Sequence, residues 1–390
     1  MFDVSLIFIF KYLSFVLENI GHFTKNTSLG IEITLPIGIS FFTFQIMSYV
    51  FDVYYGKAKV QKNVLSVALY ISLFPQLIAG PIVRYETVAD ELNNRIENSR
   101  DFTDGMIRFV FGLGKKVLIA NYVALIADNV FNMNMNDGKL AVTTAWLGVI
   151  SYALQIYFDF SGYSDMAIGL GKMFGFHFDE NFNYPYAAVS VTDFWRRWHI
   201  SLSTWFRDYI YIPLGGNRVG KSRWVFNLFI VWLLTGIWHG ANWTFVVWGL
   251  FYFILLITEK LTGFAVKLKW FSRVYTLFFV LIGWVIFRAE SLSAAWVYLK
   301  IMFGNAYAFS DQLFLYYLKG GKWVLIAAVI FSFPIVPFIK TRMETNKLAS
   351  YKFVSFSTEI IESIIVFAIF IISLLVCVSS TYNPFIYFNF

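Results

Sequence analysis

The sequence predicts an all-α polytopic membrane protein, and its composition gives the first evidence. Of the 390 residues, 58% are hydrophobic and only 14% are charged, whereas soluble domains carry about 25% charged residues. The mean hydropathy is +0.63. Aromatic residues make up 21% of the chain, and such residues suit lipid-facing packing and interfacial belts. The net charge of +7 is therefore better explained by basic cytoplasmic loops than by nucleic-acid binding.

A membrane-spanning helix needs about 20 mostly apolar residues, and several segments approach that length. The expected spans are 4–20, 31–53, 64–83, 106–131, 140–160, the long run 224–258, 274–287, 323–339 and 360–378. Some are interrupted, by Pro36, by Pro75 and Pro81, or by Lys115 and Lys116. Interrupted segments are tolerated at membrane depth only where protein or a cavity covers the backbone. We therefore expect a single domain over residues 1–390, with re-entrant and interfacial helices.

Short basic loops predict the topology of the C-terminal half. Residues 215–223, 259–273 and 340–352 are rich in Lys and Arg, which places them in the cytoplasm. The run 224–258 must then enter the membrane and return, with its bend at TGIWHGAN. The uncharged tail SSTYNPFIYFNF is expected on the outer side.

One histidine in that run is the first candidate for chemistry. The 35 residues 224–258 contain no Asp, Glu, Lys or Arg, and His239 lies near their middle. Ionisable residues at membrane depth often mark a substrate path or a reaction centre. Burial disfavours the imidazolium form, so the ring is expected to be neutral and able to accept a proton. The alternative is a core histidine bonded to a carbonyl or to an Asn across a helix packing.

The segment 193–216 predicts an amphipathic, Trp-rich helix at the membrane interface. At 100° per residue, Arg196, His199 and Arg207 fall on one stripe. This stripe either anchors the helix at lipid headgroups or binds an anionic group such as a carrier phosphate. Upstream, Asp159 and Asp165 lie in hydrophobic sequence. They either contact substrate or cap a broken helix, and we expect the cap.

Neither a disulfide nor a metal site is expected. The one cysteine, Cys377, has no intrachain partner, and the four histidines show no ligand-pair spacing.

An ordered set of motifs resembles the membrane-bound O-acyltransferase family. The motifs are PIGISFFTFQIMSYVFDVYYGK, FPQLIAGPIVRY, QIYFDFSGYSDMAIGLGKMFGF, NFNYPYAAVSVTDFWRRWHISLSTWFRDYIYIPLGGNR and LLTGIWHGANWTFVVWG. They are most similar to the branch that contains alginate and peptidoglycan O-acetylation proteins. The resemblance implies a ring of helices around a thinned membrane centre, with a tunnel in which a cytoplasmic acyl donor and an outer-side acceptor meet. Relatives carry further spans before the segment that matches 8–20, so this chain is expected to lack the most N-terminal spans of the family.

The resemblance also implies a reaction and its residues. It is the transfer of acetyl from a thioester, either acetyl-CoA or an acylated carrier protein, to a hydroxyl of a cell-surface polysaccharide. His239 matches the catalytic histidine of the family and would act as general base, and His199 matches a second, upstream histidine. The residues expected to bind substrate are Arg196, Arg207, Trp238, Asn242 and Trp243. No resident cofactor is expected.

The resemblance further implies a place in the cell and partners. We expect the chain in the bacterial inner membrane, in contact with lipids and working with a separate outer-side O-acetyltransferase. Tyr387 in the tail is a possible acyl relay, although an aromatic interfacial anchor is the favoured explanation of that tail.

Two other functions stay open at this point. One is a transporter or flippase, which the absence of inverted repeats and of paired intramembrane carboxylates disfavours. The other is an inactive scaffold.

Overall fold

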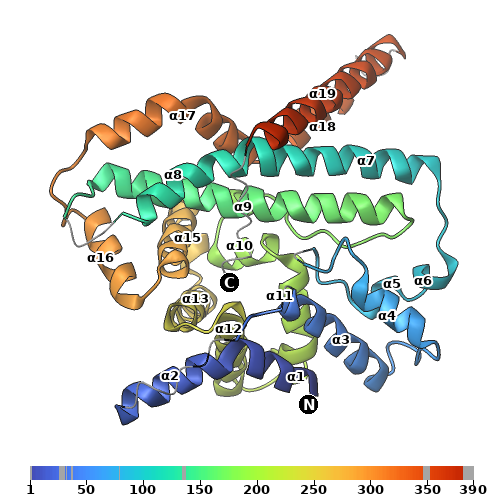
Figure 1. Ribbon diagram of the computed structural model, residues 1–390, viewed down its shortest axis with the longest axis horizontal. Coiled ribbons are helices and arrows are strands. Elements are labelled where there is room, and N and C mark those ends of the chain that lie inside the picture. The colour runs from blue at the N-terminus through green and yellow to red at the C-terminus, as the bar shows by residue number, and fades with distance from the viewer. Residues whose placement is uncertain are drawn as a thin grey trace.

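The structure is a computed structural model that describes residues 2–25, 31, 33–36, 38–78, 80–133, 138–345 and 352–380. In this part of the chain every regular element is a helix (Figure 1), which confirms the all-α class. The elements, in order, are α1 (Phe2–Ile7), η1 (Phe8–Tyr12), α2 (Leu13–Thr24), α3 (Ile39–Tyr54), α4 (Val64–Ser72), α5 (Tyr85–Val88), α6 (Glu91–Asn94), α7 (Ser99–Gly114), η3 (Lys115–Ala120), α8 (Asn121–Phe131), α9 (Val142–Met173), η5 (Pro185–Ala187), α10 (Val191–Arg197), α11 (Ile200–Phe206), η6 (Arg207–Tyr211), α12 (Lys221–His239), α13 (Trp243–Thr262), α14 (Phe264–Lys267), η7 (Lys269–Phe271), α15 (Ser272–Arg288), α16 (Leu292–Met302), α17 (Gln312–Phe331), α18 (Ile335–Thr345) and α19 (Lys352–Ser379).

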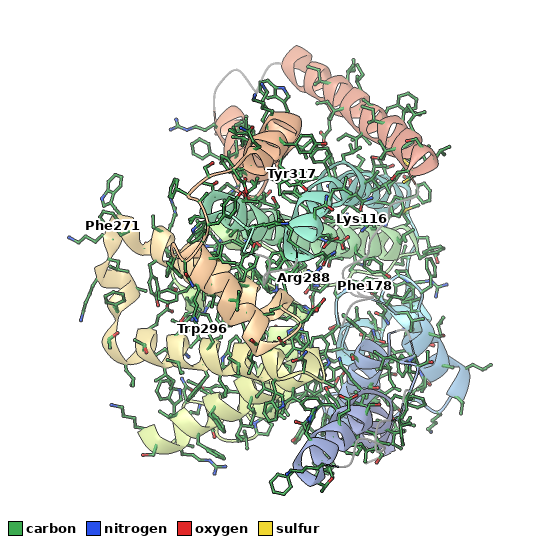
Figure 2. The ribbon with its side chains drawn as sticks, turned by 60° about the vertical axis from the view of Figure 1, so that its left-hand side comes forward. Lys116, Phe178, Phe271, Arg288, Trp296 and Tyr317 are labelled. Atoms are coloured by element: carbon green, nitrogen blue, oxygen red, sulfur yellow. The ribbon has the colours of Figure 1, made fainter. Side chains whose placement is uncertain are left out.

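Six segments of the described chain are long and apolar enough to cross a membrane. They are Asp3–Thr24, Ser99–Phe131, Trp243–Thr262, Lys269–Arg288, Gln312–Phe331 and Ile360–Ser379. Large aromatic side chains also point outward on the helical body, as Figure 2 shows for Phe271 and Trp296, which are 70% and 61% exposed. Such a surface suits lipid rather than water, so the expected multi-pass membrane protein is confirmed.

Three predicted spans have wrong boundaries, for reasons that lie in the backbone. The predicted span 64–83 is helical only as far as Ser72, because Pro75 and Pro81 follow and proline blocks helix continuation. In place of 31–53, α3 begins at Ile39, after Gly38 with φ +78°. The predicted span 323–339 starts too late, since α17 begins at Gln312 and Pro334 separates it from α18.

The helix α9 is also longer than predicted, because its polar residues find partners on neighbouring helices. It runs past the expected end at residue 160 to Met173. The Asp159 carboxylate pairs with the Lys116 ammonium at 2.7 Å, and Asp165 pairs with Lys115 at 2.6 Å. Figure 2 shows Lys116 near the helices of this layer. The expectation that Asp159 and Asp165 cap a broken helix is therefore wrong.

Close backbone contact joins α7 to α9, which lie side by side in Figure 1. A Cβ added at Gly112 would lie 2.6 Å from the Gly162 carbonyl oxygen, and one added at Gly105 would lie 2.5 Å from that of Gly169. Only glycine permits this approach at these positions, which is the packing use of small residues in membrane helices.

The helices α12 and α13 form the bent pair expected for residues 224–258. The bend comprises residues 240–242, between the end of α12 at His239 and the start of α13 at Trp243. Short helices α10 and α11 lie between this pair and the α7–α9 layer (Figure 1). The buried Glu259 of α13 fixes the start of α10, because its carboxylate accepts from the backbone N–H groups of Val191 (2.7 Å) and Thr192 (2.8 Å).

Candidate active site

His239 is the last residue of α12, and aromatic rings surround it. Its side chain is buried, with ring centroids at 4.9 Å from Trp238, 5.0 Å from Trp248 and 5.0 Å from Phe287. Within the described residues the imidazole has no hydrogen-bond partner. The alternative of a core histidine held by a carbonyl or an Asn is therefore not what the structure shows. Both ring nitrogens are left for a ligand.

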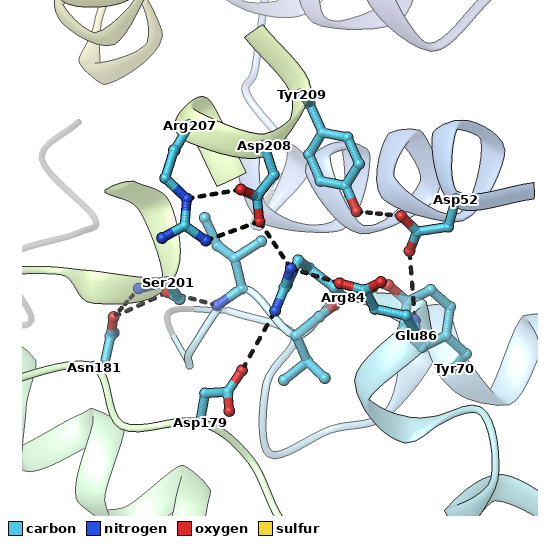
Figure 3. Close-up of polar contacts among 12 residues, drawn as sticks. Asp52, Tyr70, Arg84, Glu86, Asp179, Asn181, Ser201, Arg207, Asp208 and Tyr209 are labelled. Atoms are coloured by element: carbon cyan, nitrogen blue, oxygen red, sulfur yellow. Dashed lines mark hydrogen bonds and ion pairs between the residues drawn. The ribbon is translucent and has the colours of Figure 1, made fainter. Parts of the chain in front are cut away.

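The second histidine lies at a break in the predicted amphipathic helix. His199 has φ +45° and ψ +56° and separates α10 from α11, so the expectation of one continuous helix is wrong. Asn181 holds the break, since its carbonyl oxygen accepts the Ile200 N–H at 2.9 Å and its Oδ1 accepts the Ser201 hydroxyl at 2.9 Å. Figure 3 shows Asn181 facing Ser201. The left-handed backbone turns the His199 side chain inward.

This turn leaves His199 buried with one ring nitrogen unpartnered. The side chain is 1% exposed, and its Nδ1 lies 3.1 Å from the Oδ1 of Asn181. Because that amide oxygen can only accept, Nδ1 carries the proton and Nε2 is an acceptor. Within the described part of the chain, Nε2 has no hydrogen-bond partner.

The Trp238 ring lies close to both histidines. Its ring centroid is 6.2 Å from that of His199 and 4.9 Å from that of His239. Its Nε1–H is buried and has no acceptor among the described residues. The structure thus brings together three of the predicted site residues, His199, Trp238 and His239.

The two arginines of the predicted stripe lie elsewhere. Both are exposed, and neither shares the burial of His199. The guanidinium of Arg207 pairs with Asp208, with Nε 2.7 Å from Oδ1, and Arg84 meets the same carboxylate at 3.0 Å (Figure 3). The single stripe through Arg196, His199 and Arg207 is therefore wrong.

Asn242 and Trp243 shape the outside of the bend. Asn242 caps α13 by accepting the Thr244 N–H at 3.0 Å, and it donates to the Glu290 carbonyl at 2.9 Å. Trp243 is 52% exposed and donates to Asn19 at 3.0 Å. Their predicted contact with substrate stays a prediction. Tyr387 lies outside the described residues.

A cavity of about 1,040 Å³ reaches the wall behind His199. Side chains of α7, α9, α17 and α19 line it, together with Asn181. At one end Arg108 meets Asp165 at 2.9 Å. Elsewhere in its lining, the hydroxyls of Ser161 and Ser164 and the Nδ2 of Asn181 are buried without partners among the described residues. The sequence analysis singled out Asp165 in this lining but gave no sign of the cavity.

A further pair of residues was missed by the sequence analysis. Lys11 Nζ donates to the Trp238 carbonyl at 2.6 Å, and the Tyr12 hydroxyl donates to the Ile237 carbonyl at 2.7 Å. Both acceptors belong to the end of α12, directly before His239. The available signal was Lys11 itself, a cation inside an apolar span.

Comparison with known proteins identifies the family. The model of MBOAT, the membrane-bound O-acyltransferase family, matches residues 59–298, which include both histidines, α9 and the bent pair. The chain belongs to the membrane-bound O-acyltransferase family. This confirms the resemblance inferred from the motifs and the acyltransferase class that it implied.

Three relatives show which branch of the family is similar. A probable alginate O-acetylase of Pseudomonas putida is 39% identical over 100% of this chain and 82% of the relative. One of Pseudomonas aeruginosa is 46% identical over 77% of this chain and 58% of the relative. A peptidoglycan O-acetyltransferase of Helicobacter pylori is 39% identical over 77% of this chain and 63% of the relative. The chain thus spans less than two thirds of the length of the latter two.

Proposed function

We propose that this membrane O-acyltransferase transfers acetyl groups from a cytoplasmic thioester to hydroxyls destined for a cell-surface polysaccharide. The observation that carries the proposal is that the buried His199 and His239, at a break and a bend of the backbone, both contact the Trp238 ring. Among the described residues, His199 Nε2 has no hydrogen-bond partner. The similarity to a probable alginate O-acetylase and to a peptidoglycan O-acetyltransferase supports acetyl as the acyl group and a polysaccharide as the acceptor.

His239 acts as general base in this proposal. A neutral imidazole takes the proton of the acceptor hydroxyl while the hydroxyl oxygen attacks the thioester carbonyl carbon. A C–O bond forms, the C–S bond breaks, and the thiolate takes up the proton held by the imidazole. The products are an ester and a free thiol. General-base assistance of this kind contributes about 10²–10⁴-fold.

The donor approaches through the cavity between α7, α9, α17 and α19. The basic segment 340–352 begins within α18, the helix that follows α17, and by its charge we expect the α18 end of the cavity to face the cytoplasm. The wall of the cavity also contains Asn181, whose Oδ1 lies 3.1 Å from the Nδ1 of His199. His199 would position the thioester from that side. The Trp238 ring lies close both to His199 and to the base His239. Arg196 and Arg207 remain surface cations for donor phosphates, and Asn242 and Trp243 border the acceptor side.

The proposal extends to partners and to the tail. In the bacterial inner membrane, the acylated product would pass to a separate outer-side O-acetyltransferase, and Tyr387 would relay the acyl group. Tyr387→Phe keeps the ring and removes the hydroxyl, so unchanged surface acetylation in this variant would end the relay hypothesis.

The test compares surface O-acetyl ester in cells that carry the wild-type chain, His239→Ala or no gene, at matched membrane protein levels. We expect ester loss both in the variant and without the gene. Ester retained in His239→Ala but lost without the gene would indicate a scaffold or transporter. A labelled acyl donor distinguishes a transporter from a transferase. A transporter moves the donor across the membrane intact, whereas a transferase splits the acyl group from its carrier.

A further inference from the structure

The N-terminal helical segment holds the end of the helix that carries His239. The last four carbonyls of an α-helix have no partner within the helix, and two of those in α12 are bonded from outside. Tyr12 donates its hydroxyl to Ile237, and Lys11 donates its ammonium to Trp238. The Trp238 carbonyl belongs to the peptide bond that joins Trp238 to His239. The ammonium of Lys11 therefore lies directly beside the backbone of the candidate base.

Lys11 differs from the other partly buried cations of the protein in its partners. Arg84, Arg108, Lys115, Lys116 and Arg288 each pair with a carboxylate within 4.0 Å. For Lys11, no carboxylate among the described residues lies within that distance. Its acceptors are two neutral oxygens, those of Trp238 and of Ser40 at 3.1 Å, and its Nζ lies 5.8 Å from the centroid of the Trp238 ring.

A partly buried ammonium without a counter-charge is costly. Two of its three protons are directed to neutral acceptors, which leaves one donor and a full positive charge for another group. Within the described residues this charge has no ionic partner, and its neighbours are the carbonyl at the end of α12 and the Trp238 ring. The region around His239 is also buried and rich in aromatic rings, so the charge acts there with little screening.

We propose that the Lys11 ammonium stabilises the negative charge that develops on the acyl carbonyl oxygen during transfer. This rests on the proposed function. As the acceptor oxygen bonds to the thioester carbon, the C=O electron pair moves onto oxygen, and His239 takes the hydroxyl proton. The Lys11 ammonium donates a hydrogen bond to this oxyanion without losing its proton. When the C=O bond re-forms, the thiolate leaves and takes the proton from the imidazole. Donors of this kind act at the point where charge develops.

The chain offers a matched control for this proposal. Lys11→Met removes the charge and the bond to Trp238, whereas Tyr12→Phe removes only the neighbouring neutral bond to the same helix end. We expect Lys11→Met to lower the rate of surface O-acetyl ester formation about 10²–10³-fold, as for the loss of one oxyanion donor. Tyr12→Phe should change it less than about 5-fold, because a neutral capping bond carries no catalytic charge. Both rates are measured at matched membrane levels.

A chemical rescue separates charge from packing. In a Cys377→Ser background, which removes the one native cysteine, Lys11→Cys is alkylated in membranes with bromoethylamine or with iodoacetamide. The first reagent restores an ammonium on a side chain of lysine length, and the second adds a neutral amide. We expect activity to return only with the ammonium, with mass spectrometry confirming both modifications.

Three outcomes would overturn the proposal. They are a wild-type rate in Lys11→Met, an equal loss in Tyr12→Phe, and equal results with the two reagents, all of which point to a structural cap. Failure of the proposed function itself looks different, since His239→Ala would then keep the wild-type level of ester.

Discussion

Two regions of this protein differ in how their buried groups are paired: the charged groups between α7, η3 and α9 have ionic partners, although the cavity-lining hydroxyls of Ser161 and Ser164 on α9 have no partner among the described residues. In the α7–α9 layer, cations and carboxylates meet in pairs, as Lys116 and Asp159 do at 2.7 Å and Lys115 and Asp165 at 2.6 Å. Around His239, by contrast, buried polar atoms have no partners among the described residues. These atoms are His199 Nε2, Trp195 Nε1, Trp238 Nε1, Trp248 Nε1 and the Tyr252 hydroxyl.

The difference distinguishes polar groups that stabilise the fold from polar groups that are available to bind a ligand. A satisfied polar pair fixes helices in register, whereas an unsatisfied buried donor costs about 1–3 kcal/mol. A fold keeps several such groups together only where something else binds them. The first layer is therefore the frame, and the second is the place for substrate. The following predictions test this comparison, from the largest expected effect to the smallest.

Breaking a pair in the frame should cost the most stability. Asp159→Asn leaves the Lys116 ammonium uncompensated, and removing one partner of a buried ion pair costs about 3–5 kcal/mol. The free energy of unfolding in detergent should fall by this amount. The double variant Lys116→Met with Asp159→Leu should lie closer to wild type. A single variant as stable as wild type would show that the pair does not hold the frame.

Disturbing the support of His199 should mainly affect the reaction. Asn181→Leu removes the acceptor that orients His199 and Ser201, and a misplacement of about 1 Å can cost 10²-fold in rate. We expect acetyl transfer to fall by about that factor while membrane levels change little. The control is Asn183→Leu, two residues away, whose side chain is not part of this contact. Equal activity in the two variants would contradict the role of Asn181.

Adding one methyl group between α7 and α9 tests the close backbone contact. Gly112→Ala places a Cβ 2.6 Å from the Gly162 carbonyl, and overpacking of this kind costs about 1–3 kcal/mol. The unfolding temperature should fall, and activity per folded molecule should not. Gly56→Ala is not a suitable control, because Gly56 has φ +70°. Gly320→Ala is suitable, since nothing lies within 4 Å of its added Cβ.

The smallest effect on stability is expected at the surface arginine. Arg207→Gln breaks an exposed pair with Asp208, and surface substitutions usually change stability by less than about 0.5 kcal/mol. If Arg207 holds donor phosphates, KM for the donor should rise with kcat unchanged. An unchanged KM would indicate that Arg207 is an interfacial anchor and does not bind the donor.

Much of the fold could be predicted from the sequence, because apolar length and loop charge act locally. The bend at His239 followed from a long uncharged run between two basic loops. The break at His199 could not be predicted, because Asn181 holds it from outside the helix. The length of α9 was missed for a similar reason, since Lys115 and Lys116, which neutralise its aspartates, lie more than 40 positions earlier in the chain.

Only the part of the site that has a local signal in the sequence was predicted. A lone intramembrane histidine stands out in sequence, and so does Trp238 beside it. The prediction that Arg196, His199 and Arg207 share one helix face was wrong. Helical periodicity holds only for an unbroken helix, and the left-handed backbone of His199 breaks this one. The contact of Lys11 with the end of α12 joins residues 227 positions apart, a distance at which no pattern in the sequence indicates contact.

The most direct test measures acetyl transfer and the unfolding temperature together for His239→Asn and Asp159→Asn. Our account predicts that His239→Asn loses at least about 10² of its transfer rate, in line with the loss of a general base, and keeps its stability. Asp159→Asn should lose stability and keep its activity per folded molecule. A His239→Asn protein that unfolds early but still transfers acetyl would contradict the claim that the unpartnered histidine serves catalysis.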